Sequence, residues 1–139
     1  MKLTKTINAH DEKSWKKDVN SKPAQHLVDA LDNNKHPDEW KELTVLASIE
    51  GCNDAEAWHW IVKDQDGSFW YLTAWCDFTG WDCQSDLKYF GPYKSARGVI
   101  KEVPELDNDD RRPRELLEGQ LHVQLFSDKM ETEVLNDEN

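Results

Sequence analysis

Two runs of aromatic and β-branched residues dominate the middle of the chain. They occupy residues 57–63 and 68–75 and are separated by a short segment that ends in Asp66-Gly67. An Asp-Gly pair between two such runs is a strong signal for a β-hairpin turn. The pattern therefore predicts a tryptophan-rich hairpin over residues 57–76.

The register of this hairpin determines which side chains share a face. With a two-residue turn, Val62 lies opposite Phe69 and Trp60 lies opposite Tyr71. Both faces are then substantially apolar, so each needs cover from other elements. We therefore predict an α+β fold, in which a small antiparallel β-hairpin or short meander packs with about three to four helices.

Helical periodicity is clearest in the segment that follows Ser21. Ser21 can cap a helix N-terminus, Pro23 suits a first helical turn, and hydrophobic residues then recur at helical spacing. These features predict a helix over about residues 22–32. The hydrophobic positions are Ala24, Leu27, Val28 and Leu31.

The segment that follows Pro37 is compatible with two structures. Pro37 and the acidic residues after it resemble a first helical turn, and the hydrophobic residues from Trp40 onward fit a helical face that ends at Gly51. Residues 44–49 have a high β-branched content, which favours a strand. We favour the helix and keep the strand as the alternative.

The two ends of the chain carry weaker signals. Residues 1–20 are predicted to be weakly ordered, because any helix there needs tertiary support, and residues 130–139 are predicted to fray. A short helix is expected over about residues 95–102, and a longer one over about residues 111–127. Gly119 weakens the latter helix. Its hydrophobic positions are Leu116, Leu117, Leu121 and Leu125.

The length of the chain predicts the number of domains, and its composition gives the net charge. A chain of 139 residues is the size of one domain, and about two-thirds of the unfolded surface can be buried at that length. Residues 1–139 are therefore predicted to form a single domain. The 17 Lys and Arg against 28 Asp and Glu give a formal net charge of −11.

That charge repels nucleic-acid backbones and anionic membranes, so direct binding to nucleic acid or membrane is not expected. It favours attraction to a larger basic partner, either a host protein or a nucleoprotein complex. The cluster Arg111-Arg112-Pro113-Arg114 lies among acidic residues. We interpret it as a solvated helix start rather than a nucleic-acid patch.

Hydropathy and cysteine content indicate the compartment. No apolar run approaches the roughly 18 to 20 residues of a membrane span, and residues 1–5 lack the apolar core of a signal peptide. We therefore expect a cytoplasmic protein. The three cysteines, Cys52, Cys76 and Cys83, are an odd count, which is unlike a paired disulfide framework. Reduced thiols are expected.

A longer pattern extends beyond the hairpin. The sequence W-H-W at residues 58–60, the D-G turn and the run C-D-F-T-G-W-D-C-Q at residues 76–84 together resemble a group of small uncharacterised proteins from bacteria and their phages. The resemblance covers about residues 57–86, with a looser likeness at 116–125. In that group Tyr is commoner at the position of Phe78. The resemblance implies a prokaryotic or phage setting and one shared fold element, and assigns no chemistry.

The same region holds candidate ligands and nucleophiles. His59, Cys76 and Cys83 offer imidazole and thiolate groups that suit zinc, although six residues separate the two cysteines and common zinc motifs have two to four. Cys76 or Cys83 could alternatively act as a nucleophile, with His59 as base and Asp77 or Asp82 to orient it. A structural role for buried thiols is the favoured interpretation, and no cofactor is expected.

The loop over residues 76–86 is predicted to be structured. Its Asp and Gly residues suit a tight turn in which Trp81 folds back over the hairpin. If its aromatic side chains point outward instead, the loop is a binding surface. The candidate binding residues are Asp77, Phe78, Trp81, Asp82 and Gln84.

The leading functional hypothesis is a non-enzymatic, acidic interaction protein. In a phage or mobile-element setting, it would inhibit a host defence complex by occupying a basic nucleic-acid-binding surface. The common hydrolase and cofactor motifs do not occur in the sequence. The first alternative is a small metal-binding or thiol-dependent module that uses His59, Cys76 and Cys83. The second is a structural or assembly subunit with no soluble ligand.

Overall fold

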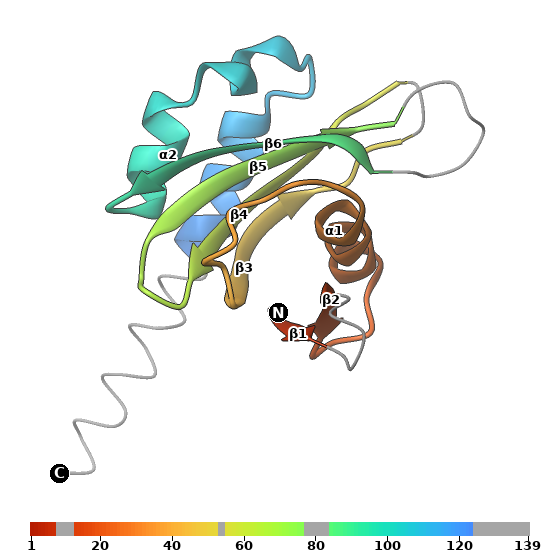
Figure 1. Ribbon diagram of the computed structural model, residues 1–139. Helices are drawn as coiled ribbons and strands as arrows, with labels where there is room; N and C mark the ends of the chain where they lie inside the picture. The colour runs from red at the N-terminus through yellow and green to blue at the C-terminus, as the bar shows by residue number, and fades with distance from the viewer. Residues whose placement is uncertain (8–12, 53–54, 77–83, 124–139) are drawn as a thin grey trace, which may run out of the picture.

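One antiparallel sheet organises the computed structural model, which describes residues 1–7, 13–52, 55–76 and 84–123. Within these residues the sheet has six strands in the order β2-β1-β3-β4-β5-β6, and β3 to β6 follow one another as a meander (Figure 1). The strands are β1 (Lys2–Ile7), β2 (Lys13–Lys17), β3 (Glu42–Ile49), β4 (Trp58–Asp64), β5 (Phe69–Trp75) and β6 (Ser85–Tyr93).

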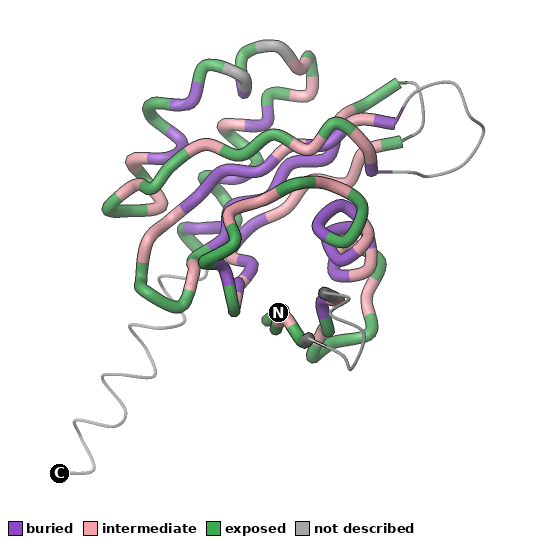
Figure 2. The backbone as a smooth tube through the Cα atoms, viewed as in Figure 1, coloured by how far each residue is buried: buried purple, intermediate pink, exposed green. Residues whose placement is uncertain are grey.

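Helices cover the two faces of the sheet. The helix α1 (Lys22–Asn33) packs on one face, and α2 (Ala96–Glu102), the 3-10 helix η1 (Pro104–Asn108) and helical residues 113–123 pack on the other (Figure 1). Buried residues concentrate in the central strands and on the inward sides of the helices (Figure 2). The core against α1 includes Trp15, Trp40, Trp58, Trp60 and Trp70.

The helix predicted over residues 22–32 is confirmed by α1. The Ser21 hydroxyl accepts a hydrogen bond from the Ala24 amide, which supplies the N-cap, and Pro23 lies in the first turn, where a missing N–H is tolerated. The residues at helical spacing, including Leu27 and Leu31, are fully buried against the sheet. The N-cap signal and the hydrophobic periodicity therefore both predict α1.

The hairpin predicted over residues 57–76 is confirmed as a local element, but its register differs from the prediction. Asp64 pairs with Ser68 across three residues rather than two, because Gly67 adopts a left-handed φ of 83° and adds one residue to the turn. Val62 consequently lies opposite Trp70. This one-residue change moves every β5 side chain to the other face of the hairpin.

Asp64 stabilises this longer turn. Its Oδ1 atom accepts hydrogen bonds from the amides of Asp66 and Ser68, at 2.9 and 3.0 Å, and its Oδ2 atom accepts one from the Trp70 indole at 2.9 Å. The last bond holds Trp70 on the α1 face beside Trp60. The predicted pairs Val62 with Phe69 and Trp60 with Tyr71 are therefore wrong.

The helix favoured for the segment after Pro37 is also wrong, because residues 42–49 form β3. In that strand Leu43 and Val45 are buried in the core against α1 and alternate with less buried residues, which is the two-residue period of a strand. A register shift between Val45 and Ala47 then places Ala47 in the core on the other face. Its neighbours are β1 and β4. The β-branched content of the segment was the better predictor.

The N-terminal segment, expected to be weakly ordered, contains β1 and β2. Leu3 and Trp15 are buried in the core against α1, and the Trp15 amide donates a hydrogen bond to Asp32 in α1. The Lys5 ammonium lies 5.3 Å from the Trp15 ring centroid. Tertiary packing thus orders a segment whose many charged residues obscure its strand pattern.

These strands overturn the predicted fold. The protein is an α+β protein whose main element is a six-stranded sheet in the described residues, not a small hairpin or short meander with three to four helices. The short helix expected at 95–102 is confirmed by α2, with Ser95 as its N-cap. Of the helix expected over 111–127, residues 113–123 are helical and the remainder lies outside the described residues.

No helix in the described part of the chain is both long and apolar enough to cross a membrane. The predicted fraying of residues 130–139 concerns a segment outside the described residues.

Candidate functional site

A buried polar network lies at the end of the sheet where β4 begins. His59 is 2% exposed, and its two ring nitrogens contact Tyr71 and Asp109. Nε2 lies 2.8 Å from Asp109 Oδ2, and Nδ1 lies 2.7 Å from the Tyr71 hydroxyl. Because an ionised carboxylate only accepts hydrogen bonds, Nε2 carries the proton of the neutral ring and Nδ1 accepts from Tyr71.

Arg111 extends the network to the ends of two strands. Its guanidinium donates to both Asp109 carboxylate oxygens, to the Glu50 backbone oxygen after β3 and to the Ala57 backbone oxygen before β4. It also lies 3.1 Å from the Glu56 carboxylate. The connection between η1 and the C-terminal helical residues is thereby fastened to the sheet.

Burial and ion pairing determine the charges in this network. Burial lowers the pKa of His59, and the hydrogen bond to Asp109 only partly opposes this effect. The Arg111 guanidinium holds the pKa of the Asp109 carboxyl well below its usual range, and Asp109 raises the pKa of Arg111 in return. At neutral pH His59 is therefore neutral, while Asp109 and Arg111 are charged.

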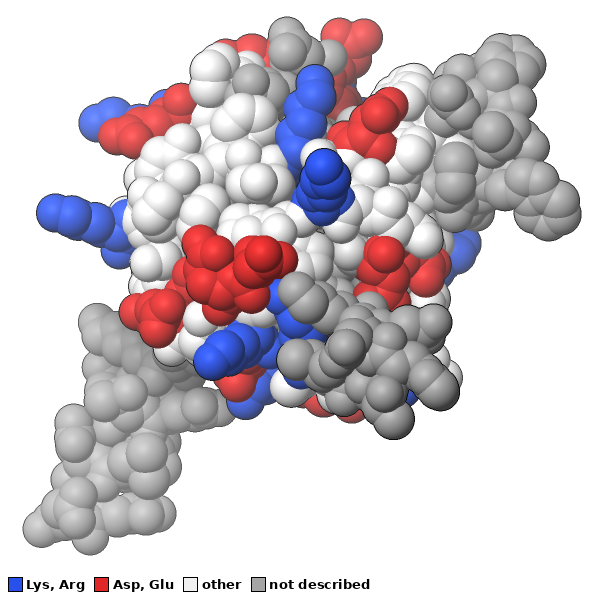
Figure 3. Space-filling model, in the orientation of Figure 1, with Lys and Arg blue, Asp and Glu red and all other residues white. Residues whose placement is uncertain are grey.

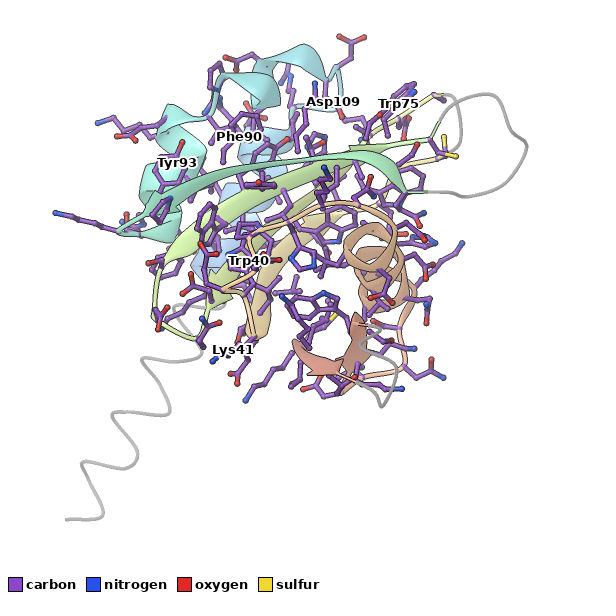
Figure 4. The ribbon with its side chains drawn as sticks, in the orientation of Figure 1. Trp40, Lys41, Trp75, Phe90, Tyr93 and Asp109 are labelled. Atoms are coloured by element: carbon purple, nitrogen blue, oxygen red, sulfur yellow. The ribbon has the colours of Figure 1, made fainter. Side chains whose placement is uncertain are left out.

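A cavity of about 800 Å³ lies against this network. Its lining includes His59, Tyr71 and Asp109, together with Trp75 from the end of β5 and Lys88 from β6. Figure 4 shows Trp75 and Asp109 at the same end of the sheet, contributed by segments far apart in the sequence. The cavity is thus bounded by the central strands on one side and by the connection after η1 on another.

More acidic than basic side chains line the cavity. Asp109 and Arg111 neutralise each other, which leaves the exposed carboxylates of Glu56, Asp86 and Asp110 against the single ammonium of Lys88 among its described lining residues. Glu56 also shares its charge with Arg111. The cavity therefore has a local negative potential that favours cationic groups.

The net charge of the described residues, taken together, is close to zero. Residues outside the described ranges hold 10 of the 28 acidic side chains and one of the 17 basic ones, so the described residues carry 18 acidic and 16 basic side chains. On the face in Figure 3, red and blue side chains form separate small groups with uncharged surface between them. On this face, the described acidic side chains therefore form no continuous patch.

The structure does not bring the predicted metal ligands together. Cys76 is buried in the core against α1, whereas His59 faces the opposite side of the sheet with Tyr71. Cys76 is disulfide-bonded, so the expectation of reduced thiols is wrong for this residue, while Cys52 is free and exposed. Cys83 lies outside the described residues.

Both nitrogens of His59 are already hydrogen-bonded, and a disulfide sulfur is neither a thiolate ligand nor a nucleophile. Among the described residues, no group of three or more His, Cys, Asp or Glu side chains is arranged to hold a metal ion.

Most of the predicted binding loop lies outside the described residues, namely Asp77, Phe78, Trp81 and Asp82. Gln84 is described and is 1% exposed, so it is not a surface contact in the free protein. Its backbone oxygen accepts a hydrogen bond from the Asn34 side chain after α1.

Sequence reasoning missed Asp109 and Arg111. The sequence places Arg111 in a solvated helix start and does not single out Asp109, but Asp109 bonds to a histidine 50 residues away and Arg111 is less than one-quarter exposed. Neither spacing nor composition signals such a long-range contact. Only the tertiary fold places the connection after η1 beside the start of β4.

The fold and the site define an α+β protein with a six-stranded antiparallel sheet in its described residues and a concave, locally acidic cavity at one end of it. No protein-family model, curated protein or solved structure matches the chain.

Proposed function

We propose that this protein is a non-enzymatic interaction protein that binds a basic surface of a partner through the cavity at the end of the sheet. The observation that carries the proposal is the excess of carboxylates, from Glu56, Asp86 and Asp110, around a cavity of about 800 Å³. A concave site with a few convergent polar groups is typical of a binding site.

The buried groups beneath the cavity favour binding over catalysis. His59 uses both ring nitrogens, and Arg111 directs its guanidinium to a carboxylate and two backbone oxygens. The polar atoms of these two side chains are therefore engaged within the fold. We therefore assign the network a positioning role, in which it holds the cavity wall in place.

A Lys or Arg side chain fits the chemistry of this cavity. The half-buried Trp75 lines it, and the face of an indole ring attracts cations. The exposed carboxylate of Asp110 would pair with the cation at the rim, where electrostatic complementarity mainly increases the association rate and the specificity.

The setting implied by the sequence resemblance narrows the partner further. In a phage or mobile element, a basic host target would be a nucleic-acid-handling defence complex such as a CRISPR or restriction enzyme. The net charge of −11 and the resemblance support this assignment. The charge distribution of the described fold favours local contact at the cavity over broad mimicry of a nucleic acid.

Affinity capture from nuclease-treated host lysate tests the proposal. We expect the wild type to capture a basic protein at low salt and to lose most of it at high salt. The variant Asp110→Lys should capture at least about tenfold less, whereas Glu102→Lys, an equal charge change on α2 and away from the cavity lining, should behave as the wild type. Equal capture by both variants would show that the cavity is not the binding site.

A further inference from the structure

The outer edge of β6 is open in the described structure. β6 lies at the border of the sheet beside β5 (Figure 1), and within the described ranges no hydrogen bond other than those of the β5 ladder reaches the backbone of residues 87–90. An unpaired edge presents a row of N–H and C=O groups to an incoming strand. The edge can therefore accept further backbone pairing.

Irregular backbone at both ends limits how much of this edge is available. Asp86 has a left-handed φ of 50°, and Gly91 has a φ of 149°, next to shifts in the β5–β6 register. Gly91 is also required for packing, because a Cβ atom there would lie 2.8 Å from the Trp70 ring. A regular stretch of paired residues over 88–90 remains between the two irregular positions.

The two edges of the sheet differ in their protection. At the other border, β2 has three lysines among its five residues, which is a common defence against edge pairing. Over residues 87–90, β6 carries one lysine, Lys88, beside the aromatic residues Tyr89 and Phe90. Residues 87–90 of β6 are therefore less protected by charge than β2.

The cavity lies directly beside this edge. Asp86, Leu87 and Lys88 line it, so a strand paired with β6 would pass along its opening. Lys88 is paired with Thr73, which also lines the cavity, and Tyr89 is paired with Leu72 in the core against α1. Side chains of the added strand would therefore alternate between the cavity and the Tyr89 side.

Each side of the edge offers a distinct contact. Tyr89 is 41% exposed and lies 5.6 Å, between ring centroids, from Trp40. Phe90 packs against Tyr71 on the opposite side, with the two ring planes tilted by 31°, and Figure 4 shows Phe90 and Trp40 on opposite sides of β6. An apolar side chain of an added strand would contact Tyr89, while its neighbour would face the acidic cavity.

We propose that an extended segment of a partner protein adds to β6 as a further strand and places a Lys or Arg side chain in the cavity. This inference rests on the proposed function and deepens it, because it names the form of the ligand. Backbone pairing supplies affinity and the cavity supplies specificity. A second copy of this chain is disfavoured as the occupant, since it would bring the same net negative charge.

Selection from a library of short random peptides, followed by hydrogen exchange on the full chain, tests the proposal. The selected peptides should share one Lys or Arg flanked by β-branched or aromatic residues. The best of them should slow amide exchange within residues 87–90. Peptides that slow exchange only at residues 55–57 and 109–111 would overturn strand addition while leaving the cavity function intact.

Proline substitution provides a second, independent readout. Adjacent residues of a strand direct their N–H groups to opposite sides, so one of Lys88 and Tyr89 donates outward and the other donates to β5. Proline at the outward position should keep the unfolding temperature near that of the wild type and weaken peptide binding at least tenfold. Alanine at the same position is the control and should weaken binding less than threefold.

Two further outcomes would overturn the proposal. One is unchanged peptide binding in the folded proline variant, because the outward N–H would then play no part. The other is a concentration-dependent dimer that the same proline disrupts, because the edge would then pair with a second copy. Failure of the proposed function is distinguishable from both outcomes, since it would appear as peptides that lack basic residues and bind equally to Asp110→Lys.

Discussion

Arg111 and Asp109 form the contact on which the geometry of the cavity depends. Arg111 reaches the backbone oxygens at the end of β3 and the start of β4, and its partner Asp109 also holds His59. A single guanidinium therefore connects three segments of the chain. Removal of one partner from a largely buried ion pair leaves the other without compensation.

We predict that Arg111→Met lowers the free energy of unfolding by about 3 kcal/mol, because it leaves the Asp109 carboxylate without its cationic partner and two backbone oxygens without their side-chain donors. The matched control is Arg112→Met, since that side chain is 79% exposed and should change stability by less than about 0.5 kcal/mol. Urea denaturation of both variants measures the difference. Similar values for the two would show that the network is not structural.

His59 should make stability depend on pH. Its pKa is lowered in the folded protein by burial, so the unfolded chain, with an ordinary pKa near 6.5, binds more protons just below that pH. The stabilising contribution of neutral His59 is thus present above about pH 6.5 and is lost as the pH falls below it. Asp109, whose pKa is also lowered, loses its contribution only below about pH 3.8.

Urea denaturation between about pH 7.5 and pH 5 measures this effect. The wild type should lose stability as the pH falls through this range, and His59→Gln should show a shallower slope, because glutamine can donate to Asp109 without titrating. The difference in slope identifies His59 whatever the stability of the variant. An identical slope in both proteins would contradict the assignment.

At the scale of elements, local signals predicted some features and tertiary contacts decided the others. Ser21 and the hydrophobic spacing after it predicted α1, and the Asp-Gly pair predicted the hairpin. The register was not predictable from the pattern alone, because the outcome depends on the left-handed conformation of Gly67. The hydrophobic residues of β3 fit both the helical and the strand periodicity. Only their backbone pairing with β1 and β4 determines that the segment forms a strand.

Alanine substitution should change the free energy of unfolding in opposite directions at Gly67 and Gly119. Gly67→Ala should lower the free energy of unfolding by about 1 kcal/mol, because a side chain disfavours its φ of 83°. Gly119→Ala should raise it by up to about 1 kcal/mol, since Gly119 is helical and a Cβ atom there meets nothing within 4 Å. Thermal unfolding of the two variants checks both signs. A stabilising Gly67→Ala would contradict the hairpin geometry.

At the scale of the whole molecule, charge is distributed differently from what composition implies. The net charge of −11 predicted an acidic surface, yet the described residues carry 18 acidic and 16 basic side chains. Composition sums over the chain and contains no information on location. The same limit applies to the site: His59 was recognised as a candidate, but its partners Tyr71 and Asp109 required the fold.

In the proposed function, the cavity beside β6 binds a basic partner. The most direct measurement is the dissociation constant of the purified captured partner at low and physiological salt, with the wild type, Asp110→Lys and Glu102→Lys. We predict weaker binding at higher salt and at least tenfold weaker binding for Asp110→Lys than for Glu102→Lys. Salt-independent binding that both variants retain equally would contradict the account.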